Sequence, residues 1–229
     1  MVLISGDRSG VAHYFLERKY KVILIARNIN RLKHLKAKFS ENDVTILSID
    51  LRNHKELLNN LDVALNAEGR VDVLVNSAGY VKRGTTDLSH DEFVKMLETN
   101  LIGLFDISNA IAPIMKKQSY GRIINISSYS GVVARDCLGG YAASKFGLMG
   151  LNEALHKELA PYGIYVTAIC PNLVDTEMTK DVTTIDRKEF IQVDDIVKTI
   201  DYLMALTPNV MVKELVLRCR AKLLKTVDG

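Results

Sequence analysis

Short segments made almost entirely of apolar residues recur along this chain, and longer segments with helical periodicity lie between them. An apolar run without polar alternation is typical of a strand that is buried on both faces of a parallel sheet. Seven such runs predict strands at residues 2–5, 22–26, 44–49, 71–75, 123–127, 165–169 and 214–218.

Three of the intervening segments have the apolar spacing of helices. Residues 54–68 place Leu57, Leu61 and Leu65 on one stripe, and residues 144–161 carry a similar stripe of leucines. Residues 90–117 are apolar on more than one face. Pro113 predicts a kink or a break in that helix, because proline removes a helical hydrogen bond.

The alternation of strand and helix predicts βαβ units, whose crossovers are right-handed in ~98% of cases. No linker or internal repeat interrupts the pattern. We therefore predict an α/β fold, with one Rossmann-type, doubly wound domain over residues 1–218 and a tail at 219–229. Its mostly parallel, seven-stranded sheet has helices on both faces, and such sheets bind ligands beyond the carboxyl ends of their strands.

Composition and charge narrow the class of protein. Of the 229 residues, 48% are hydrophobic and 25% are charged, which excludes a disordered chain. A net charge of +3 from scattered basic residues does not favour nucleic acid as a partner. Three cysteines without close spacing are typical of a reducing compartment, and no apolar run reaches the ~18 residues of a membrane span. We expect a cytoplasmic protein with neither a membrane nor a nucleic-acid partner.

The first predicted strand runs into a glycine-containing turn, in which Gly6, Arg8, Ser9 and Gly10 are the candidate residues. Glycines after a strand let the backbone approach a phosphate, and the helix that follows adds N–H donors. An ordinary turn explains two glycines equally well at this stage.

The second predicted strand ends at Arg27, and residues 22–30 contain no Asp or Glu. A fold that binds NAD usually has an acidic residue here for the ribose hydroxyls. An arginine instead suits a 2′-phosphate, so the sequence favours NADP(H) over NAD(H). The alternative is that Arg27 belongs to a solvated, basic start of the next helix.

Small or polar residues follow the next two strands and leave room for an adenosine. They are Asp50 and Leu51 after the third strand, and Asn76, Ala78 and Gly79 at the end of the fourth.

A candidate acid–base pair lies after the fifth strand. Ser128 follows that strand, and Tyr141 and Lys145 are spaced to lie on one face of a helix, one turn apart. An ammonium group beside a phenol favours the phenolate, so we expect a lowered tyrosine pKa and a general acid/base. Asn100 falls inside an apolar helix, where its amide must be hydrogen-bonded. It either bends the helix or holds a water molecule.

The order and spacing of these motifs over residues 2–218 resemble the short-chain dehydrogenases/reductases. The resemblance rests on Asn76-Ser77-Ala78-Gly79, on Asn100 with Gly103, on Ser128, on Tyr141-Ala142-Ala143-Ser144-Lys145, and on the segment from Pro171 to Thr176.

This resemblance implies roles for the catalytic candidates in an oxidoreductase acting on a carbonyl compound or a secondary alcohol. Tyr141 would exchange a proton with the substrate oxygen, and Lys145 would assist it and bind the nicotinamide ribose. Ser128 would orient the substrate oxygen, and Asn100 would hold a water molecule for proton return.

The resemblance also implies cofactor contacts and an assembly. Asp50 would contact the adenine, Val174 and Thr176 the carboxamide, and Pro171 would shape that segment. Family members form homodimers or homotetramers through helices that match residues 90–117 and 144–161.

The first loop departs from the family pattern. The family's third glycine is either replaced by Ala12 or absent, and Asp7 puts a carboxylate near a phosphate site. The segment before the second strand is also several residues shorter than in the family. Either the phosphate site is truly shortened or residues are missing from the sequence as read. A cofactor-impaired binding or regulatory protein on the same fold is therefore the alternative function.

Overall fold

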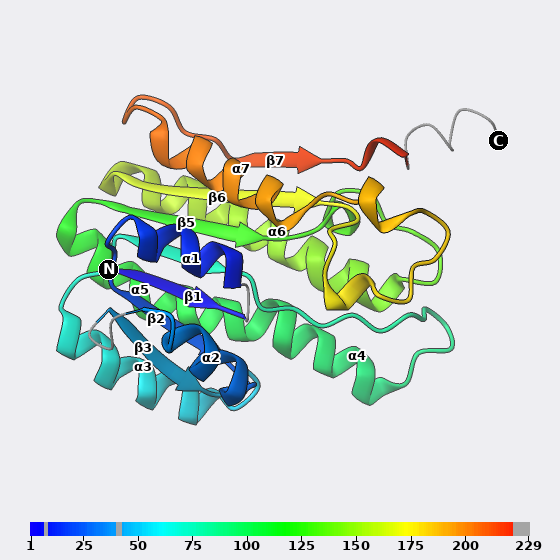
Figure 1. The fold of residues 1–229 in the computed structure, drawn as a ribbon, viewed down its shortest axis with the longest axis horizontal. Helices are drawn as coiled ribbons and strands as arrows, with labels where there is room; N and C mark the ends of the chain where they lie inside the picture. Colours follow the sequence, from blue (N-terminus) through cyan, green and yellow to red (C-terminus); the bar gives the residue numbers. More distant parts are fainter. Residues whose placement is uncertain (7–8, 40–42, 222–229) are drawn as a thin grey trace.

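The computed structural model describes residues 1–6, 9–39 and 43–221 and contains a seven-stranded, fully parallel sheet in the order β3-β2-β1-β4-β5-β6-β7 (Figure 1). This confirms the predicted doubly wound fold. The strands are β1 (Val2–Ser5), β2 (Val22–Ala26), β3 (Val44–Ser48), β4 (Val73–Asn76), β5 (Gly121–Ile126), β6 (Ile164–Pro171) and β7 (Glu214–Leu217).

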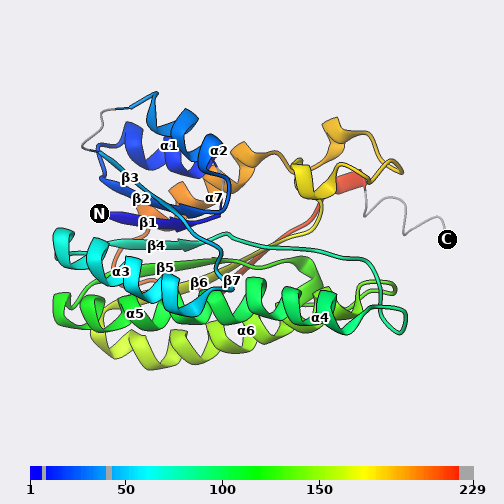
Figure 2. The ribbon, with the colours of Figure 1, turned by 90° about the horizontal axis from the view of Figure 1, so that it is seen from below.

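Helices cover both faces of the sheet (Figure 2). One face carries α1 (Ser9–Glu17), α2 (Ile29–Lys36) and α7 (Val193–Ala205). The other carries α3 (His54–Glu68), α4 (His90–Leu97), α5 (Gly103–Gln118) and α6 (Gly139–Leu159). Each face encloses its own cluster of buried apolar side chains, which explains why the inner strands are apolar throughout.

The long helix predicted at 90–117 is interrupted, but not at Pro113. Pro113 lies inside a continuous α5, where its buried neighbours Ile111 and Met115 hold the helix against the sheet. The interruption is a π-helical turn, Glu98–Ile102, which joins α4 to α5 around Asn100. The helix is therefore interrupted at Asn100 instead of Pro113. Such π-helical turns are frequent in functional sites.

The fourth strand begins two residues later than predicted because a side chain satisfies the backbone of Val71. Gln118 accepts a hydrogen bond from the N–H of Val71 at 2.9 Å and donates one to its carbonyl oxygen at 2.7 Å. Within the described residues, no helix has the length and apolar character needed to cross a bilayer.

Candidate active site

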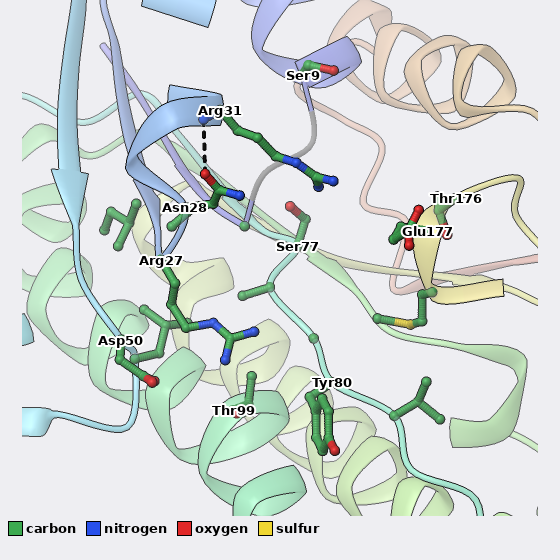
Figure 3. Close-up of a pocket in the computed structure, with 18 of the residues that line it drawn as sticks. Ser9, Arg27, Asn28, Arg31, Asp50, Ser77, Tyr80, Thr99, Thr176 and Glu177 are labelled. Atoms are coloured by element: carbon green, nitrogen blue, oxygen red, sulfur yellow. Dashed lines mark hydrogen bonds between the residues drawn. The ribbon is translucent and has the colours of Figure 1, made fainter. Parts of the chain in front are cut away.

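A cavity of about 1060 Å³ opens at the carboxyl ends of the central strands (Figure 3). It lies where β1 and β4 are neighbours although the chain connects β1 to β2, which is the usual position of a ligand site in such a sheet. Nine of the predicted cofactor residues line it: Gly6, Ser9, Gly10, Arg27, Asp50, Leu51, Ala78, Gly79 and Thr176.

The first loop brings backbone rather than side chains to this cavity. Gly6 has a φ of 93°, and a Cβ there would lie 2.8 Å from the backbone nitrogen of Ala78. Only glycine allows so close an approach. The N-terminus of α1 follows at Ser9, so N–H groups without a partner inside the helix and the positive end of the helix dipole lie beside the cavity. The predictions on Asp7 and Arg8 fall outside the described residues.

Two arginines point into the cavity from the end of β2 and the start of α2 (Figure 3). They are Arg27 and Arg31, and the Asn28 side chain caps α2 by accepting from the backbone N–H of Arg31 at 3.1 Å. Nothing acidic stands beside them on β2. The cavity therefore carries positive charge at the place where the family distinguishes ribose hydroxyls from a 2′-phosphate.

Asp50, beside Arg27 in the cavity wall, is held by a forked ion pair with Arg52. The guanidinium of Arg52 donates to one carboxylate oxygen of Asp50 at 3.0 Å and to the other at 2.7 Å. These bonds hold the pKa of Asp50 below its usual value. The charge leaves Asp50 as an acceptor only, so it would contact an adenosine through a donor group of that ligand.

Three of the four catalytic candidates, Ser128, Tyr141 and Lys145, are buried and come from the end of β5 and from α6. Tyr141 and Lys145 lie one turn apart on α6, and the Lys145 ammonium nitrogen is 5.9 Å from the centre of the Tyr141 ring. That nitrogen also donates to the carbonyl oxygen of Ile126 at 3.1 Å. Ser128 accepts from the backbone N–H of Ser130 at 3.1 Å, which fixes its hydroxyl at the end of β5.

Two glycines connect these residues to the cavity and to each other. A Cβ on Gly79, in the cavity wall, would lie 3.9 Å from the Lys145 ammonium and 3.6 Å from the Asn100 side-chain oxygen. A Cβ on Gly131 would lie 2.8 Å from the Lys145 carbonyl oxygen, so only a glycine lets the Ser128 turn pack on α6. The Lys145 ammonium and the Asn100 side chain therefore lie next to the cavity wall at Gly79.

The Asn100 side chain is fully engaged inside the π-turn. It accepts from the backbone N–H of Tyr80 at 2.7 Å and donates to the Tyr80 carbonyl at 2.8 Å. It also donates to the Ser144 hydroxyl at 2.9 Å, which in turn donates to the Tyr141 carbonyl at 2.7 Å. The side chain thus braces the catalytic helix against the loop that follows β4.

A second brace, which the sequence did not indicate, runs beneath the site as a one-directional chain of buried hydrogen bonds. Ser5 donates to Asn76 at 3.4 Å, Asn76 to Asn125 at 2.9 Å, and Asn125 to Asn152 at 3.0 Å. Asn152 donates to the Lys213 carbonyl at 3.1 Å. The chain links β1, β4, β5, α6 and the approach to β7, and it turns the Asn76 side chain into the core instead of the cavity.

Apart from Tyr141 and Lys145, three predicted cofactor residues in the described part of the chain do not line the cavity. Besides Asn76, these are Pro171, the last residue of β6, and Val174, which is 5% exposed and paired with Ile191 in an isolated bridge. Conversely, Tyr80, Thr99 and Met178 line the cavity although the motifs did not single them out.

The family model for short chain dehydrogenases matches residues 1–186. The chain belongs to this family. An uncharacterized oxidoreductase of Staphylococcus aureus strain USA300 is 32% identical over 215 residues, which is 93% of both proteins. Membership in the short-chain dehydrogenases confirms the resemblance drawn from the motifs and makes the chain an oxidoreductase by family.

Solved structures of short-chain dehydrogenases agree with the fold over nearly the whole chain. ElxO with NADP bound superposes with a TM-score of 0.84 at 27% identity, covering 98% of both chains. A β-ketoacyl-[ACP] reductase from Bacteroides thetaiotaomicron gives 0.82 at 31% identity, covering 97% of this chain and 98% of that one. 4-Hydroxyisoleucine dehydrogenase complexed with NADH and succinate gives 0.84 at 29%, covering 96% and 98%.

Proposed function

We propose that this short-chain dehydrogenase is an NADP(H)-dependent oxidoreductase that interconverts a carbonyl compound and a secondary alcohol. The observation that carries the proposal is that Lys145, one turn from Tyr141 on α6, lies beside the Gly79 wall of the cavity, with the Ser128 turn packed on the same helix. Ketone, aldehyde and 3-oxoacyl compounds are the substrate classes to test.

The residues at the cavity suit a dinucleotide. The close approach of Gly6, the α1 N-terminus at Ser9 and the two arginines supply a cradle, donors and positive charge. When bound, the nicotinamide supplies the hydride chemistry. Of the protein's residues, Thr176 and Lys145 would position that ring and its ribose.

Tyr141 would act as the general acid in reduction and the general base in oxidation. Its phenol would give a proton to the substrate oxygen or take one from it. The ammonium of Lys145 supports the phenolate by its charge, and the Ser128 hydroxyl would hydrogen-bond the same substrate oxygen.

Arg27 supports the preference for the phosphorylated cofactor. Its guanidinium can form a forked, charge-assisted contact with a 2′-phosphate, and the ribose of NAD(H) offers no such group. Among the solved relatives, ElxO has NADP bound and 4-hydroxyisoleucine dehydrogenase has NADH, so the family includes both choices.

Two measurements test this function. Titration of the purified protein with NADPH and NADH, followed by nucleotide fluorescence, should show tighter binding of NADPH. A panel of carbonyl compounds with NADPH absorbance as readout should then identify turnover. Absence of binding of either nucleotide at millimolar concentration would contradict the enzyme assignment.

The alternative is a binding or regulatory protein that has lost cofactor affinity. The observation in its favour is the short first crossover, in which α1 has nine residues and ends at Glu17. The same nucleotide titration separates the two, since this alternative requires an intact fold without nucleotide binding.

We also propose that the chain forms a homodimer or homotetramer through α5 and α6. Phe105 on α5 and Phe146 on α6 are 47% and 44% exposed, and Ile102, directly before α5, is 48% exposed. Covering them would bury apolar area. Light scattering of the wild type and of Phe105→Glu tests this assembly, and the variant should lower the observed mass.

A further inference from the structure

Two of the three cations in the segment that follows β6 are paired within the segment itself. Arg187 pairs with Asp175, and Lys180 pairs with Glu177 at 2.9 Å. These two cations are therefore already occupied by carboxylates of the same segment.

Arg218 places a further positive charge at this edge of the sheet, over the residue that follows Ser128. It follows the last residue of β7, Leu217, which is in register with Pro171 at the carboxyl end of β6. Its guanidinium carbon is 4.9 Å from the ring centre of Tyr129, the residue directly after Ser128. The side chain is exposed, and in the described part of the chain no ion pair includes it.

The backbone that carries Arg218 is firmly anchored. The next residue, Cys219, is 2% exposed, and its N–H donates to the Asn172 side chain at 2.8 Å. Its thiol donates to the Glu189 carbonyl at 2.9 Å. Arg218 thus projects from a fixed point, and its ring stacking limits the positions of the guanidinium without using its hydrogen-bond donors.

We propose that Arg218 binds the carboxylate of the substrate, so that the substrate class is a short hydroxy acid or oxo acid. The inference rests on the proposed function, because it assumes that Ser128 and Tyr141 hold the reacting oxygen. A guanidinium matches a carboxylate with two parallel N–H···O bonds, and the Tyr129 face keeps its plane oriented. The carboxylate then fixes the distance between the anion and the reacting carbon.

The test compares charged and neutral versions of one substrate. 3-Hydroxy acids of three to five carbons and their methyl esters are oxidised with NADP⁺ by the wild type, Arg218→Gln, Arg218→Lys and the matched control Arg220→Gln. Arg220 is exposed two residues away, so its variant removes the same charge from the same segment.

For Arg218→Gln we expect kcat/KM for the acid to fall by about tenfold to a hundredfold, mainly through KM. The ester should change by less than about twofold, Arg218→Lys should restore part of the loss, and Arg220→Gln should resemble the wild type. Equal losses for acid and ester would overturn the proposal and assign Arg218 to packing on Tyr129. A wild type that prefers esters would overturn it as well.

A binding measurement without turnover separates this inference from the enzyme assignment. Calorimetric titration with 3-hydroxybutyrate should show binding to the wild type and Arg220→Gln, and binding weaker by about tenfold or more to Arg218→Gln. If no nucleotide binds but this difference persists, the proposed function fails and the carboxylate site stands. If NADPH binds and the acid binds equally to all variants, or to none, the carboxylate site fails.

Discussion

The catalytic half of the site and the nucleotide half are built differently. Ser128, Lys145 and Asn100 are buried, and hydrogen bonds within the protein already hold their side chains. Arg27, in the nucleotide half, is exposed and reaches into an open cavity. The catalytic half is therefore already held in place by the protein's own hydrogen bonds. The nucleotide half offers backbone groups and positive charge to a ligand.

The difference follows from what each half must do. A proton-transfer group acts on one oxygen atom, so its position must be fixed in advance, and buried, fully satisfied hydrogen bonds achieve this. A dinucleotide is large and charged, so a glycine turn, a helix N-terminus and arginines can hold it without a rigid polar network. Damage to the first half should therefore remove turnover, and damage to the second should reduce affinity.

The largest effect is expected for Tyr141→Phe. Removing the phenolic oxygen should reduce kcat by about 10² to 10⁴ because the proton loses its carrier. NADPH affinity should change little, since the ring remains in place. Tyr202→Phe, at a 51% exposed position, is the control and should keep full activity. Substantial residual turnover would exclude Tyr141 from the acid–base role.

Breaking the buried amide chain should cost stability. Asn152→Ala leaves the Asn125 amide without its acceptor and should lower the free energy of unfolding by about 1–3 kcal/mol. Urea unfolding measures this, with Asn66→Ala on the exposed surface of α3 as the control. An unchanged midpoint would show that water replaces the lost bond and that the catalytic half is less rigid than the comparison implies.

Arg27→Gln tests the nucleotide half. The variant should bind NADPH about tenfold more weakly, the equivalent of one charge-assisted contact of ~1.4 kcal/mol, and should leave NADH affinity unchanged. Fluorescence titration at two salt concentrations measures both, because a charged contact weakens with salt. Lys33→Gln on α2 removes a cation elsewhere and serves as the control. An equal loss for both nucleotides would disprove a 2′-phosphate contact.

The smallest effect is a pH dependence at Asp50. Its folded-state pKa is lowered by the Arg52 hydrogen bonds, so the ion pair contributes stability above the unfolded pKa of ~3.9. That contribution is lost as the pH falls through the lower, folded-state value. In Asp50→Asn this component of acid destabilisation should be absent. Urea unfolding midpoints at neutral and acid pH measure the effect, with Asp62→Asn on α3 as the control. If Asp50→Asn lost as much stability in acid as the wild type, the lowered pKa assigned to Asp50 would be contradicted.

Much of the fold was predictable because the strands lie between two helical layers. Burial on both faces requires uninterrupted apolar runs, and these identified β1 and β2 with their bounds. The leucine stripe did the same for α3. The break predicted as one outcome at Pro113 does not occur, since the local cost of proline is outweighed by packing of α5 that the sequence does not display.

The sequence by itself determined the family, the sheet, and the serine, tyrosine and lysine of the candidate site, because these depend on short-range periodicity and spacing along the chain. Only the tertiary structure decided that Asn76 faces the core, that Asn152 supports it through Asn125, and that Arg218 stands over Tyr129. These contacts join residues that are 27 to 89 positions apart. Which residues meet in these contacts is set by how the strands and helices pack, and the local pattern along the chain carries no information about this packing.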